Sequence, residues 1–339
     1  MKRIGIILAL LLVMNLMGCA ARPVTTNPSD TTPTKTPTET MWYQNAKLNT
    51  NTDWSTPIVE TETHFYYIAE DGVYEYAKDV KQISQIIPET VYGLYLYEEN
   101  LYYNTEHEVK CINLHTESIS LIWDNTMLGN SDKYHYISLN DFALHDGHLY
   151  IAGTRTSVMR VNLEDYTTEQ FLGDCGKMVL LSNECYYLDH AERTFSLYHM
   201  KCDSKESTLL RGEGLSEPGT NKLRIDGIAG MEDLIVYSVR DTSDVYLYHP
   251  DGNDEKIFDG GGSGQDWLFF IERCPANKLY FYTTDKSMLK LYEYQPETGI
   301  SLLTSFDCST RICDIVITET TAFLYSEEES AVKCWHIGN

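Results

Sequence analysis

The sequence predicts an all-β protein, a seven-bladed β-propeller of four-stranded antiparallel blades. Two observations lead to this prediction. A phrase of aromatic and aliphatic residues recurs seven times, with starts 36 to 50 residues apart, and a turn and a second strand-like run follow each copy. Recurrence at such a period with strand-like segments is typical of propellers, in which each repeat forms one blade.

The two runs of each repeat have the pattern of a β-hairpin. Period-two alternation and enrichment in Tyr, Val, Leu and Phe are what half-buried strands require. The first runs are HFYYIA (64–69), NLYYNT (100–105), HLYIAG (148–153), ECYYLD (184–189), LIVYSV (234–239), KLYFYT (278–283) and TAFLYS (321–326). The second runs are GVYEYA (72–77), EVKCIN (108–113), SVMRVN (157–162), FSLYHM (195–200), DVYLYH (244–249), LKLYEY (289–294) and AVKCWH (331–336).

Shorter apolar runs flank the hairpins and complete the four strands of a blade. One precedes each hairpin, such as GLYLY (93–97), and one follows each of the first six, such as SISLIW (118–123). The seventh repeat has no run after its hairpin, so residues 41–50, MWYQNAKLNT, are predicted to supply its outer strand. Closing the ring in this way would remove an exposed sheet edge. The alternative is a six-bladed propeller with an irregular edge.

Residues 1–18 are predicted to be a signal peptide. Lys2 and Arg3 form a basic start, Ile4 to Leu16 an apolar run, and the sequence LMGC ends at Cys19. This arrangement resembles a bacterial lipoprotein signal, which implies cleavage before Cys19 and a diacylglycerol on its thiol. An ordinary secretory signal or a transmembrane anchor is the alternative, although the apolar run is shorter than the roughly 20 residues that span a bilayer.

Residues 19–40 are predicted to be a linker that carries the lipidated cysteine. The segment is rich in Thr and Pro and poor in large apolar residues, so it cannot bury enough surface to offset the cost of ordering. The propeller would then occupy residues 41–339. We expect it to face outside the cytoplasm in a bacterial cell envelope, with the lipid as its only contact with the membrane.

The net charge and the cysteine content limit the kinds of partner and metal site that the sequence predicts. A formal net charge of −24 repels phosphate backbones, which argues against nucleic acid as a partner. Of nine cysteines, eight remain besides Cys19, and none forms a CxxC pair. A zinc site is therefore not expected. We expect buried thiols with at most one or two disulfides.

The repeats resemble a known family. The stretches FYYIAEDGVYEY and LYFYTTDKSMLKLYEYQPETG look like the YWTD-type repeats of low-density-lipoprotein-receptor-related propellers and of uncharacterised bacterial lipoproteins with YWTD-like domains. The likeness extends over roughly residues 41–339, but no blade contains an intact Tyr-Trp-Thr-Asp. The resemblance implies a propeller with a binding role and carries no catalytic residue onto this chain.

The long loops are candidates for a ligand site. In an antiparallel blade, the turn between the second and third strands and the crossover to the next blade lie on one face. The crossovers at 124–138, 212–224 and 259–267 are long, and long loops on a rigid scaffold are where binding usually resides. The candidate ligand-binding residues are Tyr134, His135, Tyr136, Trp267, Asp124, Asp132, Asp259 and Asp266.

Aromatic rings flanked by carboxylates suit sugars or cationic peptide side chains. The alternative is that Tyr134 and Tyr136 pack between blades and that the carboxylates are simply solvated. No cofactor is expected, with calcium kept as an option. The stretch DGNDEKIFDGGG (251–262) begins like a calcium loop, but Lys256 and Gly262 replace key positions. His145 and His148 bracket a turn and would need a third metal ligand.

These features favour a binding or scaffolding propeller for a protein, peptide or glycan. One alternative is an exported carbohydrate-active hydrolase or lyase, and another is a structural subunit of an envelope complex. The segment GGSGQ (261–265) lacks the last glycine of a nucleophile elbow, and no other catalytic motif is found, so an enzyme is disfavoured. An enzyme would gather acids with opposed pKa shifts at the central mouth, whereas a binder needs an exposed aromatic patch with ordinary acids.

Overall fold

The described residues of the computed structural model all lie in one compact unit, Thr32–Asn339. None of their helices combines the length and apolar character needed to cross a membrane. The structure describes residues 41–46, 55–124, 139–153, 157–173, 175–189, 196–212, 224–231, 233–261, 267–271, 278–284, 288–307, 312–326 and 331–337.

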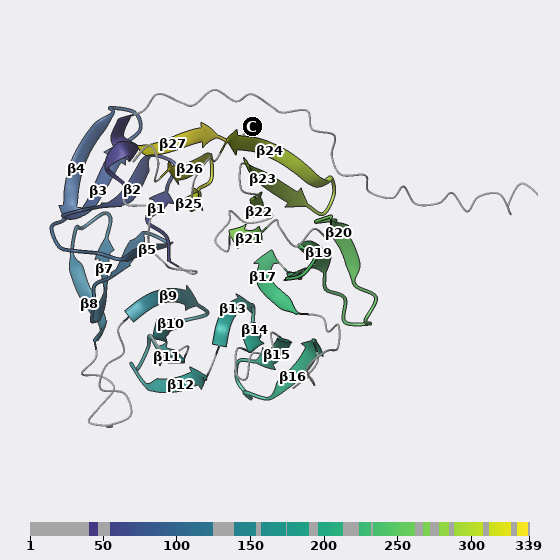
Figure 1. Ribbon diagram of the computed structural model, residues 1–339. Coiled ribbons are helices and arrows are strands. Elements are labelled where there is room, and N and C mark those ends of the chain that lie inside the picture. Colours follow the sequence, from purple (N-terminus) through teal and green to yellow (C-terminus); the bar gives the residue numbers. More distant parts are fainter. Residues whose placement is uncertain are drawn as a thin grey trace, which may run out of the picture. The chain divides into compact units, whose positions relative to one another are not determined.

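The described residues form seven antiparallel sheets that follow one another along the chain (Figure 1). In every sheet the strands lie side by side in sequence order. Blade 1 contains β1 (Ile58–Glu60), β2 (His64–Ala69), β3 (Gly72–Ala77) and β4 (Gln82–Ile87). Blade 2 contains β5 (Gly93–Tyr97), β6 (Asn100–Asn104), β7 (Glu108–Asn113) and β8 (Ile119–Asp124). Blade 3 contains β9 (Leu139–His145), β10 (His148–Gly153), β11 (Val158–Asn162) and β12 (Thr168–Leu172).

The remaining four sheets repeat this order, and the last has three strands. Blade 4 contains β13 (Cys175–Leu181), β14 (Glu184–Asp189), β15 (Ser196–Lys201) and β16 (Ser207–Arg211). Blade 5 contains β17 (Ile225–Met231), β18 (Leu234–Val239), β19 (Asp244–Leu247) and β20 (Glu255–Phe258). Blade 6 contains β21 (Trp267–Ile271), β22 (Leu279–Thr284), β23 (Met288–Gln295) and β24 (Gly299–Asp307). Blade 7 contains β25 (Ile312–Ile317), β26 (Thr321–Ser326) and β27 (Ala331–His336).

Seven hydrophobic cores hold the blades together, one between each pair of neighbours. Strand β2 shows how the sequence pattern produces them. Phe65 and Tyr67 pack toward blade 7, whereas the alternate residues Tyr66 and Ile68 pack toward blade 2. Both sides of the strand are therefore buried, which explains its nearly continuous apolar run. Because the seventh core joins blade 7 to blade 1, the ring closes and the predicted seven-bladed propeller is confirmed.

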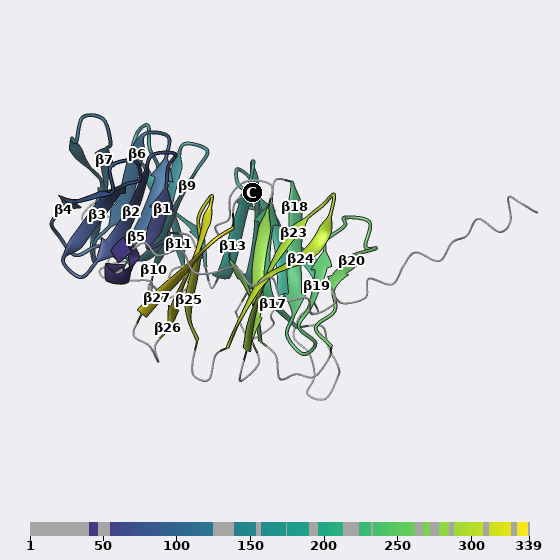
Figure 2. The ribbon, with the colours of Figure 1, turned by 90° about the horizontal axis from the view of Figure 1, so that it is seen from above.

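The strand order divides the connections between two faces of the ring. Successive strands are antiparallel, so their turns alternate between the two ends of each sheet (Figure 2). We call the face with the links between blades the crossover face. We call the other, which carries the turns between first and second strands and between third and fourth strands, the hairpin face.

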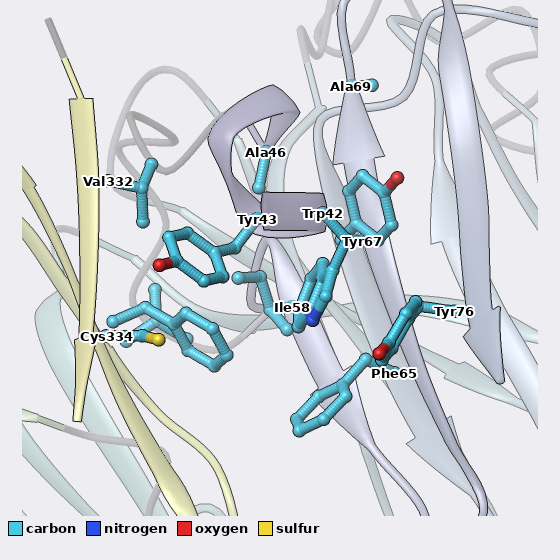
Figure 3. Packing of buried hydrophobic residues seen from close by; sticks show 12 residues of the cluster. Trp42, Tyr43, Ala46, Ile58, Phe65, Tyr67, Ala69, Tyr76, Val332 and Cys334 are labelled. Carbon is cyan, nitrogen blue, oxygen red and sulfur yellow. The ribbon is translucent and has the colours of Figure 1, made fainter. Parts of the chain in front are cut away.

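A short helix closes the ring beside blade 7. The 3-10 helix η1 (Met41–Asn45) contacts β27 and inserts Trp42 and Tyr43 into the core between blades 7 and 1 (Figure 3). Trp42 stacks on Phe65 and Tyr76, with ring centroids 4.9 and 5.3 Å apart. The helix thus seals the junction between the two ends of the propeller.

The predicted outer strand at residues 41–50 is wrong for residues 41–45, which form η1 instead. The side chain of Gln44 takes over part of the role of that strand. Its Nε2 donates to the carbonyl of Val332 at 2.8 Å, and its Oε1 accepts from the backbone N–H of Val332 at 3.3 Å. A primary amide carries a donor and an acceptor in one plane, so it replaces one residue of strand pairing.

A buried carboxylate makes a second link across the junction. Glu60, at the end of β1, accepts hydrogen bonds from Lys78 Nζ at 2.6 Å and from the N–H and Oγ1 of Thr320 at 3.0 and 2.7 Å. Burial alone would raise the pKa of Glu60. The hydrogen bonds from Lys78, Thr318 and Thr320 outweigh burial, so its pKa lies below the usual value and the group stays ionised.

Candidate functional site

Most of the predicted ligand residues lie outside the described residues. These are Tyr134, His135, Tyr136, Asp132 and Asp266, and the predicted lipidation site Cys19 lies outside them too. Trp267 is the first residue of β21 and pairs with Thr284, so its backbone is on the crossover face as expected. Its side chain is not among those described. The proposed site on this face stays a prediction.

Asp124 and Asp259 are the two predicted ligand residues with described side chains. Asp124 ends β8, where the crossover into blade 3 begins, and pairs with Glu108. Asp259 follows β20 in blade 5; its exposed carboxylate accepts from the N–H of Gly261 at 3.0 Å and lies 4.0 Å from Lys256 Nζ. Both residues lie on the crossover face, but their blades are not neighbours and no described contact joins them.

The stretch that begins like a calcium loop has a structural role at Asp254. The carboxylate accepts from Nε and Nη2 of Arg211 at 2.5 and 2.6 Å, from the hydroxyl of Tyr237 at 2.7 Å and from the N–H of His249 at 2.9 Å. Arg211 ends the outer strand of blade 4, so these bonds join blades 4 and 5. The site therefore holds an arginine rather than presenting an open carboxylate.

The histidines of the HDGH turn contact backbone carbonyls. His145 Nε2 contacts the carbonyl of Ser182, and His148 Nδ1 lies 2.7 Å from the carbonyl of Asp146. Within the part of the chain that the structure describes, no group of three His, Cys, Asp or Glu side chains is placed to hold a metal ion.

The described cysteine side chains form no disulfide with one another. Four of them are buried and pack as small apolar residues, as the sequence predicts, and Cys111 is half-buried. The five are Cys111, Cys175, Cys185, Cys202 and Cys334.

The carboxyl groups with clear pKa shifts among the described residues all shift downward, because of hydrogen bonds and ion pairs within the fold. They are Glu60, Asp165, Glu169, Asp244, Asp251 and Asp254. Acid–base catalysis by a carboxyl pair needs one carboxyl with a raised pKa. These six groups are instead anions near neutral pH, and four of them, Glu60, Glu169, Asp244 and Asp254, are already paired with Lys or Arg side chains of the fold.

An exposed aromatic residue stands out on the hairpin face. In blades 1 to 4, the turn between the third and fourth strands ends in a residue with positive φ. The backbone N–H of that residue donates a hydrogen bond to the carbonyl four residues earlier. The residue at that position is Lys81, Glu117, Tyr166 or Lys205, and blade 6 has Gly299 with a φ of 76°. Tyr166 is the aromatic member of this set, and 49% of its surface is exposed.

Two tyrosines of blade 2 lie at the same junction between blades 2 and 3 as the turn of Tyr166. Tyr97 ends β5 and is 45% exposed, and Tyr102 in β6 is half-buried. Burial is the main cause of the raised pKa of Tyr102, and Cys111, Glu98, Tyr97 and Tyr166 raise it further. Tyr102 and Leu163, which lies in the turn of Tyr166, pack against the same core between blades 2 and 3. The pairing of Tyr95 with Tyr102 and of Tyr97 with Asn100 puts Tyr97 and Tyr102 on the same side of blade 2. We call Tyr97, Tyr102 and Tyr166 the tyrosine patch.

The backbone that carries the patch is fixed by contacts between blades 2 and 3. The hydroxyl of Tyr95 donates to the carbonyl of Leu144 at 3.0 Å. Leu163, in the turn of Tyr166, packs in the core between these blades, and its N–H donates to Gly147 O at 3.0 Å. The patch is therefore built on a pre-organised surface.

Carboxylates border the tyrosine patch. Glu98 and Glu99 follow Tyr97 in the sequence, and Glu164 and Asp165 precede Tyr166; all four are exposed. Asp165 accepts from the Oγ1 and N–H of Thr167 at 2.7 and 2.9 Å, and these bonds lower its pKa. The patch thus combines aromatic rings with permanent negative charge.

Sequence reasoning missed this patch because it searched the long crossover loops. A signal was present in the repeat alignment. Tyr166 occupies a turn position at which blades 1, 2 and 4 have Lys81, Glu117 and Lys205. An aromatic residue in place of a charged one, with no core to enter, marks a candidate contact surface.

No protein family model and no curated protein sequence matches the chain. Solved structures share its fold. A chain of the mitotic checkpoint complex has a TM-score of 0.59 and 9% identity, with 94% of this chain and 97% of that chain covered. BBS1N in complex with ARL6DN has a TM-score of 0.53 and 9% identity, over 86% and 95% of the two chains. The β-propeller domain of Cps50 (Swd1) from Myceliophteria thermophila has a TM-score of 0.51 and 10% identity, over 84% and 96%.

At these identities the similarity establishes the fold alone. Together with the seven sheets of the chain itself, it places the molecule in the structural class of β-propellers. The fold is consistent with a binding or scaffolding role, which propellers fulfil with the turns and loops of one face.

Proposed function

We propose that the protein is a lipid-anchored binding propeller of a bacterial cell envelope, and that its partner is a protein or peptide. The observation that supports this best is a closed, rigid ring that displays exposed tyrosines beside ionised carboxylates on short, hydrogen-bonded turns. Two of the similar structures, BBS1N with ARL6DN and the mitotic checkpoint complex, are complexes between proteins. A glycan is the alternative partner.

The proposal extends to the family and the anchor. The aromatic doublets of β2 and β6 support a YWTD-like propeller, in which the repeat serves to build blades. The basic start, the apolar run and Cys19 support a lipoprotein signal, with residues 20–40 as a tether. The propeller would then face outside the cytoplasm, where it could also serve as a subunit of a larger envelope complex.

Replacement of Cys19 by alanine is expected to release the protein from membranes, because the modified thiol is the proposed anchor. The measurement is fractionation of cells that express the full chain, followed by detection of the protein in the membrane and soluble fractions. A Cys111→Ala variant is the matched control, because it also loses a thiol that is not fully buried but keeps the anchor. Membrane association of Cys19→Ala equal to that of the wild type would contradict the lipoprotein assignment.

Capture on an array of peptides and glycans tests the binding role. We expect the purified full chain to retain a subset of the peptides, with and without added calcium. Trp267→Ala is the variant for the crossover face, and loss of capture in it would support the site predicted from the sequence. Absence of selective capture for both peptides and glycans would contradict a binding propeller with small linear ligands. In that case crosslinking in native membranes would test the role as a subunit of a complex.

A further inference from the structure

We propose that the tyrosine patch binds a lysine or arginine side chain of a peptide segment in the partner protein. This inference rests on the proposed binding function and names both its surface and the chemistry of its ligand. It places the contact on the hairpin face between blades 2 and 3, opposite the face that the sequence favoured.

The first argument is the exposure of the aromatic rings. Tyr97 and Tyr166 are 45% and 49% exposed, although both could be replaced by polar residues without loss of core packing. They come from two neighbouring blades, and Tyr102 and Leu163, which lies in the turn of Tyr166, pack against the core that joins these blades. Tyrosine offers a large rigid surface at low conformational cost, which is why it is enriched in protein interfaces.

The second argument comes from how the fold itself uses such groups. In four places it combines an aromatic ring, a cation and a carboxylate. The cations are Lys78 over Phe65, Arg160 over Phe171, Arg211 over Tyr248 and Lys256 over Tyr246, at 4.5, 5.1, 4.8 and 5.9 Å from the ring centroids. Their carboxylates are Glu60, Glu169, Asp254 and Asp244 respectively.

The tyrosine patch contains two of these three components. Tyr97 and Tyr166 are exposed and are followed or preceded in the sequence by Glu98 and Asp165, and the described hydrogen bonds, ion pairs and ring contacts of these residues include no Lys or Arg side chain. Two imidazoles border the patch: His115 Nε2 lies 3.1 Å from Glu99, and His148 contributes to the lowered pKa of Asp165. A cation from a partner would complete the arrangement with a cation–π contact and an ion pair.

The net charge supports the choice of a cationic ligand. The chain has a formal charge of −24, so its surface attracts basic segments and repels acidic ones. An uncharged sugar could stack on the tyrosine rings, but it would form no ion pair with the carboxylates. The combination of rings and anions therefore favours a basic peptide over a glycan.

The test uses the full chain and synthetic peptides of equal length. One peptide contains lysines separated by glycines, and its control contains acetyl-lysine at the same positions, so that only the charge differs. We expect binding of the lysine peptide and at least about tenfold weaker binding of the acetylated one. Tyr97→Ala/Tyr166→Ala is expected to weaken binding of the lysine peptide by about tenfold, from two lost cation–π contacts.

The double variant leaves the net charge unchanged, so it separates the patch from general attraction to an acidic protein. Tyr92→Ala is the matched control, because Tyr92 is 43% exposed but lies in the crossover between blades 1 and 2. It should bind as the wild type does. Equal unfolding midpoints of the three proteins would show that both variants are folded.

Equal binding by the wild type and the double variant would overturn the inference. If selective capture on the array were lost in Trp267→Ala and kept in the double variant, the binding function would be supported, and the assignment of binding to the tyrosine patch would be wrong. Capture of a glycan that depends on Tyr97 and Tyr166, without capture of the lysine peptide, would overturn the assignment to a cationic ligand.

Discussion

Replacing Trp42 by alanine is expected to lower the free energy of unfolding by about 3–5 kcal/mol, the usual range for a large buried aromatic residue. Trp42 is 5% exposed and stacks on Phe65 and Tyr76 of blade 1. It also makes an edge contact with Phe323 of blade 7 at 5.5 Å. The substitution would therefore open a cavity at the junction that closes the ring. Equilibrium unfolding in urea measures the change.

Tyr92→Ala is a suitable control, because it removes an exposed ring and should change the free energy of unfolding by no more than about 0.5 kcal/mol. A loss below about 1 kcal/mol for Trp42→Ala would mean that the closing core can reorganise without η1. In that case the junction between blades 7 and 1 would depend mainly on Glu60 and its hydrogen bonds.

Replacing Asp254 by alanine is expected to cost about 3 kcal/mol, because removal of one member of a buried ion pair leaves its partners without compensation. The side chain of Asp254 is 8% exposed and that of Arg211 is 20% exposed. The alanine variant would also leave the buried hydroxyl of Tyr237 without its acceptor. Unfolding in urea at neutral pH is the measurement, with Asp254→Asn as the milder variant that keeps an acceptor but no charge.

The difference in unfolding free energy between wild type and Asp254→Asn, measured as a function of pH, tests whether the charge of Asp254 causes the stabilisation. Arg211, His249 and Tyr237 together outweigh the effect of burial and lower the pKa of Asp254 below its usual value. A lowered folded-state pKa stabilises the protein above the unfolded-state pKa, which is about 4, and this stabilisation disappears as the pH falls through the folded-state pKa. The gap between wild type and Asp254→Asn should therefore be constant from pH 7 to about 5 and shrink below about 4. A gap that stays constant at low pH would exclude this mechanism.

Much of the fold could be predicted from the sequence, because the strands of a propeller are local in the chain. The runs at 64–69 and 234–239 coincide with β2 and β18 to the residue. Inner strands such as β2 and β18 are buried on both sides by neighbouring blades, so their apolar pattern is strong, and the repeats support one another. The closing segment was not predictable in detail. The contact of Gln44 with Val332 replaces strand pairing by a side chain, and no periodicity reports that.

The candidate site was harder to predict for a different reason. Loop length directed attention to the crossover face, whereas the exposed rings of Tyr97 and Tyr166 are in short turns. Their proximity depends on how blades 2 and 3 pack, which the sequence of either blade alone does not contain. The same holds for the ion pair of Arg211 and Asp254, whose members are 43 positions apart in neighbouring blades.

The closure of the ring also determines the order in which the molecule can be completed. Gln44 and Val332 are 288 positions apart. The aromatic residues near Gln44 are therefore synthesised first, whereas blade 7, which covers them, is synthesised last. Until blade 7 is present, blades 1 to 6 can form only an open arc whose two end blades expose apolar sides. One of these sides contains Trp42 and Phe65, and the other contains Tyr280 and Leu291. A chain that ends before β25 would keep both surfaces exposed and would tend to associate with its copies, because the final three strands are what covers these two apolar sides.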